Sequence, residues 1–219
     1  MALRVVLEVA PKRVFASALD WPGWSRGAKT PDEAIAALLA YAPRYARVAK
    51  RAKVPFAPPK TERGIEILER QSGGAGTEFG VPSSTAKAER DALSSRELAR
   101  LVSLLEAAWA AFDAAARKAE GVSLALGPRG GGRQVPKMVE HVREAESAYV
   151  HQLGPKARGQ SMAELRRSFV EALELLAAGE PFPNPNKVKR PWTPRYAIRR
   201  SAWHALDHAW EIEDRSPSG

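Results

Sequence analysis

The chain of 219 residues contains no cysteine and only four histidines. The absence of cysteine excludes disulfides, thiolate zinc sites and a cysteine nucleophile. Long hydrophobic runs are also missing, since the most apolar stretch, residues 107–116, is too short to span a membrane and contains Asp113. The first residues, MALRVVLEVAPKR, lack the apolar core and cleavage site of a secretory signal. We therefore expect a cytoplasmic protein without a membrane segment.

The composition is that of a folded protein with a basic surface. Hydrophobic residues make up 44% and charged residues 27%, and the length suits one ordinary domain or a small domain beside a medium one. The net charge of +9 favours contact with nucleic acid or other anions. A basic sum without a recognition motif also fits a protein that simply has a basic surface, and we favour that interpretation.

The first 90 residues mix strand-like runs with one helix. Residues 3–9 and 14–19 predict strands, and residues 20–24 predict a turn. A helix begins after Thr30, because Thr-Pro-Asp-Glu supplies an N-cap, a first-turn proline and a capping-box glutamate. Pro43 is expected to kink or end that helix. Weaker signals predict a linker at 54–59, strands at 64–68 and 78–81, and a turn at 71–76.

The remainder of the chain predicts four amphipathic helices. They follow Ser94, span residues 136–152, follow Ser161, and run from the cap Thr193 to about residue 214. The glycine-rich residues 127–132 and the proline-rich residues 181–194 separate them. We therefore predict an α+β protein. Residues 1–90 form a small domain of order β-β-α-β(-β), and residues 91–219 form an up-down four-helix bundle.

Three of the four histidines are placed to meet. His204 and His208 stand four residues apart on the last helix, so their side chains share one face. His141 lies on the apolar stripe of the second helix of the bundle. Three imidazoles suit one divalent ion, and zinc, nickel, iron and manganese are not distinguished. The alternative for His141 is a hydrogen-bonded core histidine.

Other residues near these motifs receive different predictions. His151, near a helix end, is expected to be a surface or C-terminal capping residue. Ala205 stands where zinc proteases of the His-Glu-x-x-His type carry their general base, which excludes that class. Asp207 points off the histidine face, so we expect it at the surface or behind a metal ligand. Tyr149 and Glu144 are candidates for proton transfer, although such residues more often pack or face solvent.

The order of the histidine motifs resembles the DinB superfamily, also described as YfiT-like metal-dependent hydrolases. The resemblance covers roughly residues 93–215, where VEHVREAESAYV carries His141 and RRSAWHALDHAWEIEDR carries His204 and His208. It implies a three-histidine metal site with open positions for water or a small-molecule substrate. Known members include thiol-dependent transferases and maleylpyruvate isomerases. The resemblance thus implies a metal-dependent transferase or hydrolase that uses a low-molecular-weight thiol. A relative that keeps the metal without turnover is an open alternative.

The N-terminal part resembles the small HicB-like module of antitoxins. The resemblance covers about residues 3–45 and is carried by Pro22-Gly23 and by the T-x-x-E-A helix start at residues 30–34. The chain departs from antitoxins because no DNA-binding helix-turn-helix follows. The resemblance therefore implies an accessory domain that packs on the bundle or mediates a homodimer.

A binding module for nucleic acid or a protein partner is the alternative function. A basic stretch precedes and enters the last helix, and Trp192 and Trp203 interleave with it in positions that would allow stacking on bases. We favour the simpler interpretation, in which the stretch is a solvated loop and helix face and the tryptophans pack on the bundle. The basic residues are Lys187, Lys189, Arg190, Arg195, Arg199 and Arg200.

Overall fold

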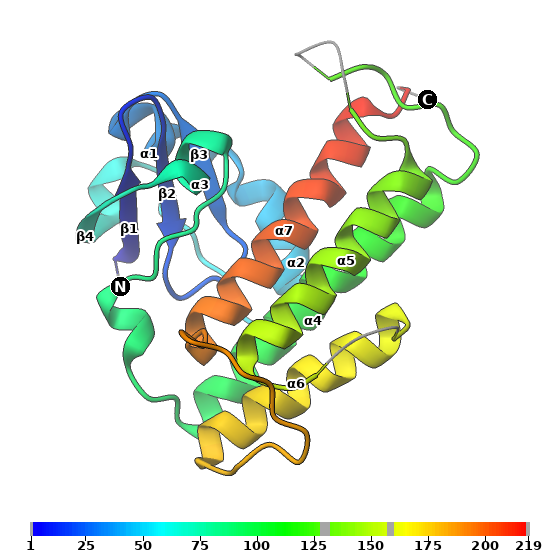
Figure 1. The fold of residues 1–219 in the computed structure, drawn as a ribbon. Coiled ribbons are helices and arrows are strands. Elements are labelled where there is room, and N and C mark those ends of the chain that lie inside the picture. Colours follow the sequence, from blue (N-terminus) through cyan, green and yellow to red (C-terminus); the bar gives the residue numbers. More distant parts are fainter. Residues whose placement is uncertain (1, 128–131, 157–159, 218–219) are drawn as a thin grey trace.

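The computed structural model describes residues 2–127, 132–156 and 160–217 and has an α+β fold (Figure 1). A mixed sheet of four strands has the order β3-β2-β1-β4. The predicted strands β1 (Leu3–Val9) and β2 (Val14–Ala18) are present and pair antiparallel, as do β2 and β3 (Ser25–Ala28). β4 (Ile65–Ser72) lies parallel to β1.

The order of elements around the sheet corrects the sequence prediction in three places. Strand β3 comes before the first helix and was missed, because four residues that include a glycine carry little strand signal. β4 extends through Ser72 and so overruns the predicted turn at 71–76. Residues 78–81 form no strand, since α3 (Ala75–Phe79) occupies the position and ends at Gly80, whose φ is 107°.

Two helices follow β3 where one was predicted. α1 (Pro31–Ala40) has the predicted capping box, in which the Thr30 side chain accepts from the Glu33 N–H. α1 ends before Pro43, as expected, but α2 (Ala42–Arg51) begins at once. Pro43 lies in the first turn of α2, where a missing N–H costs nothing, so the proline starts a helix as well as ending one.

The four predicted long helices are all present. They are α4 (Ser95–Lys118), α5 (Val135–Leu153), α6 (Met162–Ala178) and α7 (Pro194–Arg215). Ser94, Ser161 and Thr193 cap α4, α6 and α7 through their side-chain oxygens, as the sequence predicts. The boundary predicted between residues 90 and 91 falls between the 3-10 helix Lys87–Arg90 and α4.

The directions of these helices differ from the predicted up-down alternation. α4 and α7 run parallel, because residues near their starts and near their middles meet: Arg195 pairs with Glu97, and Trp109 donates to Ser201. α5 runs antiparallel to α7, and α6 antiparallel to α4 (Figure 1). The order is therefore up-down-down-up. The hydrophobic period of a helix fixes its buried face and not its direction, which depends on the path of the connections.

Helix α7 lies between the sheet side of the molecule and the other long helices. Toward the sheet it packs Trp203 against Phe15 and pairs Asp207 with Arg26. Toward the bundle it packs against α4 and α5, and the buried hydrophobic side chains form one cluster from the sheet through the helices. A helix held on all sides positions its side chains rigidly, which suits a site. Within the described ranges, no helix has the length and apolar character needed to cross a membrane.

Candidate metal centre

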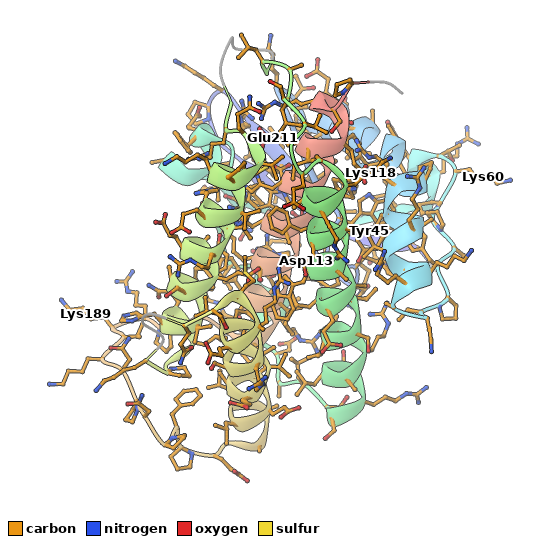
Figure 2. All side chains as sticks on the ribbon, turned by 90° about the vertical axis from the view of Figure 1, so that its right-hand side faces the viewer. Tyr45, Lys60, Asp113, Lys118, Lys189 and Glu211 are labelled. Atoms are coloured by element: carbon orange, nitrogen blue, oxygen red, sulfur yellow. The ribbon has the colours of Figure 1, made fainter. Side chains whose placement is uncertain are left out.

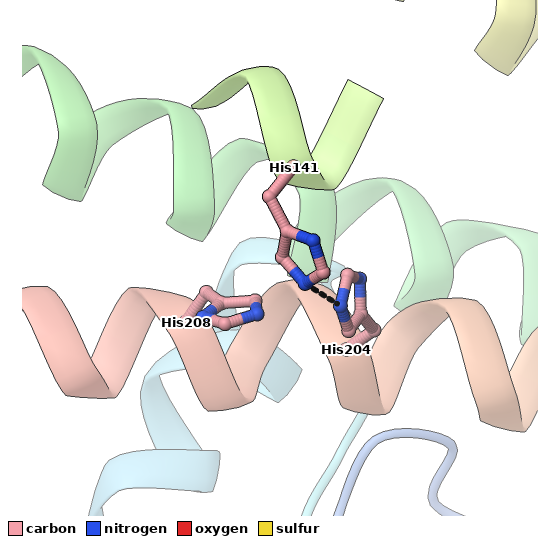
Figure 3. A group of neighbouring side chains, drawn as sticks. All are labelled: His141, His204 and His208. Atoms are coloured by element: carbon pink, nitrogen blue, oxygen red, sulfur yellow. Dashed lines mark hydrogen bonds between the residues drawn. The ribbon is translucent and has the colours of Figure 1, made fainter. Parts of the chain in front are cut away.

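The structure brings His141, His204 and His208 together between α5 and α7 (Figure 3). One ring nitrogen from each residue lies within 4.8 Å of the others. The Nε2 atoms of His141 and His204 are 3.1 Å apart, and the three ring centroids are separated by 4.7, 5.0 and 5.1 Å. The three side chains that the helical period selected thus form one cluster.

These distances fit a shared ion. Two nitrogens bound to one zinc at about 2.0–2.1 Å, with angles near 90–110°, are roughly 2.9–3.4 Å apart. The separation of 3.1 Å between His141 and His204 lies in this range. The ligand nitrogens of all three histidines lie within 4.8 Å of one another. A small rotation of the side chains would bring all three to the distances of a shared ion. A hydrogen bond between two neutral imidazoles would also give 3.1 Å, so the distance is compatible with both states.

Burial favours the neutral form of His204 and of His141, which is the form that binds metals. His204 is 7% exposed, and burial lowers its pKa well below the usual range, with the charges of His208 and Arg200 acting in the same direction. Burial and then the charge of Arg133 lower the pKa of His141, which is half-buried. A neutral imidazole is the ligand form, since a proton competes with the ion for the same nitrogen. The partial exposure of His141 leaves the cluster reachable from solvent.

A carboxylate behind His208 completes the arrangement. Nδ1 of His208 lies 2.9 Å from Oε2 of Glu211, and the other oxygen of Glu211 accepts from Arg215 at 2.6 Å. The hydrogen bond with His208 lowers the pKa of Glu211. Metal-binding histidines commonly donate their second N–H to such a carboxylate, which fixes the ring and leaves the other nitrogen for the ion. The sequence analysis missed Glu211, although its position three residues after His208 placed it within reach.

The two candidates for proton transfer lie in different surroundings. Tyr149 is buried, its ring centroid is 5.8 Å from that of His204, and burial raises the pKa of its phenol. Glu144 is exposed on α5. Tyr149 is therefore the candidate beside the histidine cluster, and it holds its proton at neutral pH.

His151 and Asp207 form their contacts outside the histidine cluster. His151, in the last turn of α5, lies with its Nε2 2.6 Å from the Asn186 side-chain nitrogen, away from the cluster. Asp207 pairs with Arg26 of β3 at 3.2 Å, and within the described residues it forms no hydrogen bond or ion pair with a histidine of the cluster. Asp207 thus serves the contact between α7 and the sheet.

The basic stretch before and within α7 is divided between surface and interior. Lys189 projects from the loop before α7 (Figure 2). Arg199, in contrast, is buried and paired with Glu89. Trp192 is half-buried and packs against Tyr149 of α5, as the interpretation of tryptophans packed on the bundle predicts. Trp203 is buried as well, but it packs against Phe15 of the sheet and not on the bundle.

The fold and the cluster define an α+β protein with three histidines gathered between two long helices. Comparisons with protein-family models, with curated proteins and with solved structures find no match.

Proposed function

We propose that the protein binds one divalent metal ion through His141, His204 and His208 and acts as a cytoplasmic metal-dependent transferase or hydrolase of the DinB type. The observation that carries the proposal is the convergence of three imidazoles from two helices, with Glu211 on the second nitrogen of His208. In this proposal residues 93–215 are the DinB-like unit, and residues 3–45 are a HicB-like accessory module.

The chemistry follows from the charge of the ligands. A divalent ion held by three neutral ligands keeps its full charge, so a water or thiol bound to it becomes more acidic. The chain has no cysteine, so a thiol nucleophile would come from a low-molecular-weight cosubstrate. Tyr149 is protonated and lies beside His204, which suits it to donate a hydrogen bond to a group at the ion. Zinc, nickel, iron and manganese all accept imidazole ligands.

Metal content tests the proposal directly. The chain is purified after growth with zinc, nickel, iron and manganese, and metals are counted by mass spectrometry. The wild type and a His151→Ala control, which alters a histidine outside the cluster, are expected to hold about one ion per chain. The His204→Ala/His208→Ala double variant is expected to hold none. A wild type without metal overturns the proposal and moves the nucleic-acid- or protein-binding alternative to the front.

Turnover is tested separately on the metal-loaded chain. Transfer of a small thiol to an electrophilic substrate is followed in the wild type and in the double variant. Activity that depends on the histidines supports the transferase. Hydrolysis without thiol supports the hydrolase. Full metal content without either activity would identify a relative that keeps the metal site alone.

A further inference from the structure

Arg200 stands in line with two members of the histidine cluster. It precedes His204 by four residues on α7, as His204 precedes His208, so the three side chains follow one face of the helix at intervals of one turn. Aromatic rings connect Arg200 to the cluster. Its guanidinium carbon lies 5.2 Å from the centroid of Tyr149 and 4.8 Å from that of Trp203, and both rings lie beside His204, at 5.8 and 6.3 Å.

Among the described residues, no carboxylate forms a salt bridge with Arg200. None of the salt bridges in the described parts of the chain contains Arg200, and its Nη1 atom is buried without a hydrogen-bond partner. Nε1 of the neighbouring Trp203 is likewise buried and unpartnered. Both atoms are donors only, so the group they lack is an acceptor. Buried donors are nearly always paired, so each of these two atoms calls for an acceptor.

The aromatic contacts explain why Arg200 remains in place without an anion. Tyr149 and Trp203 offer ring faces that attract a cation and hold the planar guanidinium beside the cluster. Such a guanidinium presents paired N–H groups that match the oxygens of a carboxylate or a phosphate. The position beside a candidate metal site, and not the protein surface, indicates that the missing anion belongs to a ligand.

We propose that Arg200 binds the oxyanion group, a carboxylate or a phosphate, of the substrate whose reacting end lies at the three histidines. The inference rests on the proposed function and deepens it, because it names the substrate class. Arg200 and His204 are four residues apart, about 6 Å along the helix axis, and this short interval favours a small anion whose charged group and reacting atom are separated by only a few bonds. Arg200 is then a specificity residue that positions the substrate.

The test measures anion binding and metal binding on the same samples. The full-length chain is loaded with cobalt(II), whose visible absorption reports on its ligands, and is titrated with acetate and with methyl phosphate. The variants are Arg200→Met and Arg200→Gln, two neutral replacements of different polarity whose folding is checked by circular dichroism. Arg195→Met is the control, since Arg195 lies on the same helix but pairs with Glu97. Cobalt per chain is counted in every sample.

One anion is expected to change the wild-type spectrum saturably, and the responding anion identifies the charged group. The neutral Arg200 variants should keep their cobalt and bind that anion about tenfold more weakly or worse, since a charge-assisted bidentate contact is lost. Arg195→Met should match the wild type. Equal anion affinity in wild type and Arg200 variants, or no response to either anion, overturns this inference and leaves the metal site standing. A wild type that binds no cobalt overturns the proposed function and this inference with it.

Discussion

Arg199 and Arg200 are neighbours on α7, yet they face different parts of the molecule and their guanidinium groups have different partners. Arg199 is buried, with its guanidinium donating to Glu89 at 3.0 Å and to the carbonyl oxygen of Ser84 at 2.9 Å. Arg200 lies over the rings of Tyr149 and Trp203, and in the described ranges it forms no salt bridge with a carboxylate. The side of α7 that faces the N-terminal part satisfies its charges within the chain. The side that faces α5 carries His204, His208 and Arg200. The histidines suit a metal ion, and the guanidinium of Arg200 suits an anion.

The largest expected effect on stability comes from replacing Arg199, on the side of α7 where the charges are paired. Arg199→Met leaves the buried Glu89 carboxylate unpaired and should lower the free energy of unfolding by about 3–5 kcal/mol. Arg200→Met removes a charge that has no salt bridge within the part of the chain that the structure describes, and it should cost less than about 1 kcal/mol. Both values are measured by chemical denaturation. The Arg199→Met/Glu89→Gln double variant should recover part of the loss. Equal losses for the two arginine variants would show that the two sides do not differ as described.

Zinc binding tests the side of α7 that carries the histidine cluster, because it should raise the free energy of unfolding. At a free concentration one hundred times its dissociation constant, an ion that binds only the folded state adds about 2.7 kcal/mol to the free energy of unfolding. We expect such a rise in the wild type and in His151→Ala, and none in His204→Ala. Thermal unfolding with and without zinc measures it, and a chelator should reverse it. Equal stabilisation of His204→Ala would place the zinc elsewhere on the chain.

The members of the site were predictable from the sequence to the extent that helical geometry governs them. The interval between His204 and His208 and the position of His141 on an apolar stripe both follow from the helical period, and the structure brings the three together. Glu211 was missed because a carboxylate three residues after a histidine is common on helix surfaces and acquires a role only once the histidine is turned toward an ion. Arg200 was assigned to a basic surface stretch, since the sequence carries no sign of which cations are balanced.

The fold was predictable where local signals are strong and not where they conflict with packing. Thr30, Ser94 and Ser161 each mark a helix start that the structure keeps. The strand predicted at 78–81 failed because Gly80 adopts a left-handed conformation that ends a helix there. α2 was missed because Pro43 was taken only as a helix breaker. The parallel pairing of α4 with α7 joins residues about one hundred positions apart, which no local pattern encodes.

Replacing Glu211, whose carboxylate lies behind His208, should have a smaller effect, which is measured on zinc affinity. Glu211→Gln keeps the shape of the side chain but removes the charge that orients the ring and raises the basicity of its free nitrogen. Loss of such a carboxylate typically weakens metal binding by about tenfold to a hundredfold. The zinc dissociation constant is measured by competition with a chelator of known affinity. An unchanged constant would mean that Glu211 serves the ion pair with Arg215 and not the metal site.

The smallest expected effect belongs to Asp207, which lies between the two histidines in sequence but turns away from them. Its side chain is 38% exposed, and its carboxylate pairs with Arg26 of β3 at 3.2 Å. Asp207→Asn should therefore lower the free energy of unfolding by less than about 1 kcal/mol, as expected for a partly exposed ion pair. Its metal content and zinc affinity should equal those of the wild type, in contrast to Glu211→Gln. A loss of zinc affinity in Asp207→Asn would show that the sheet side of α7 also supports the metal site, and would remove the division between the two sides of this helix.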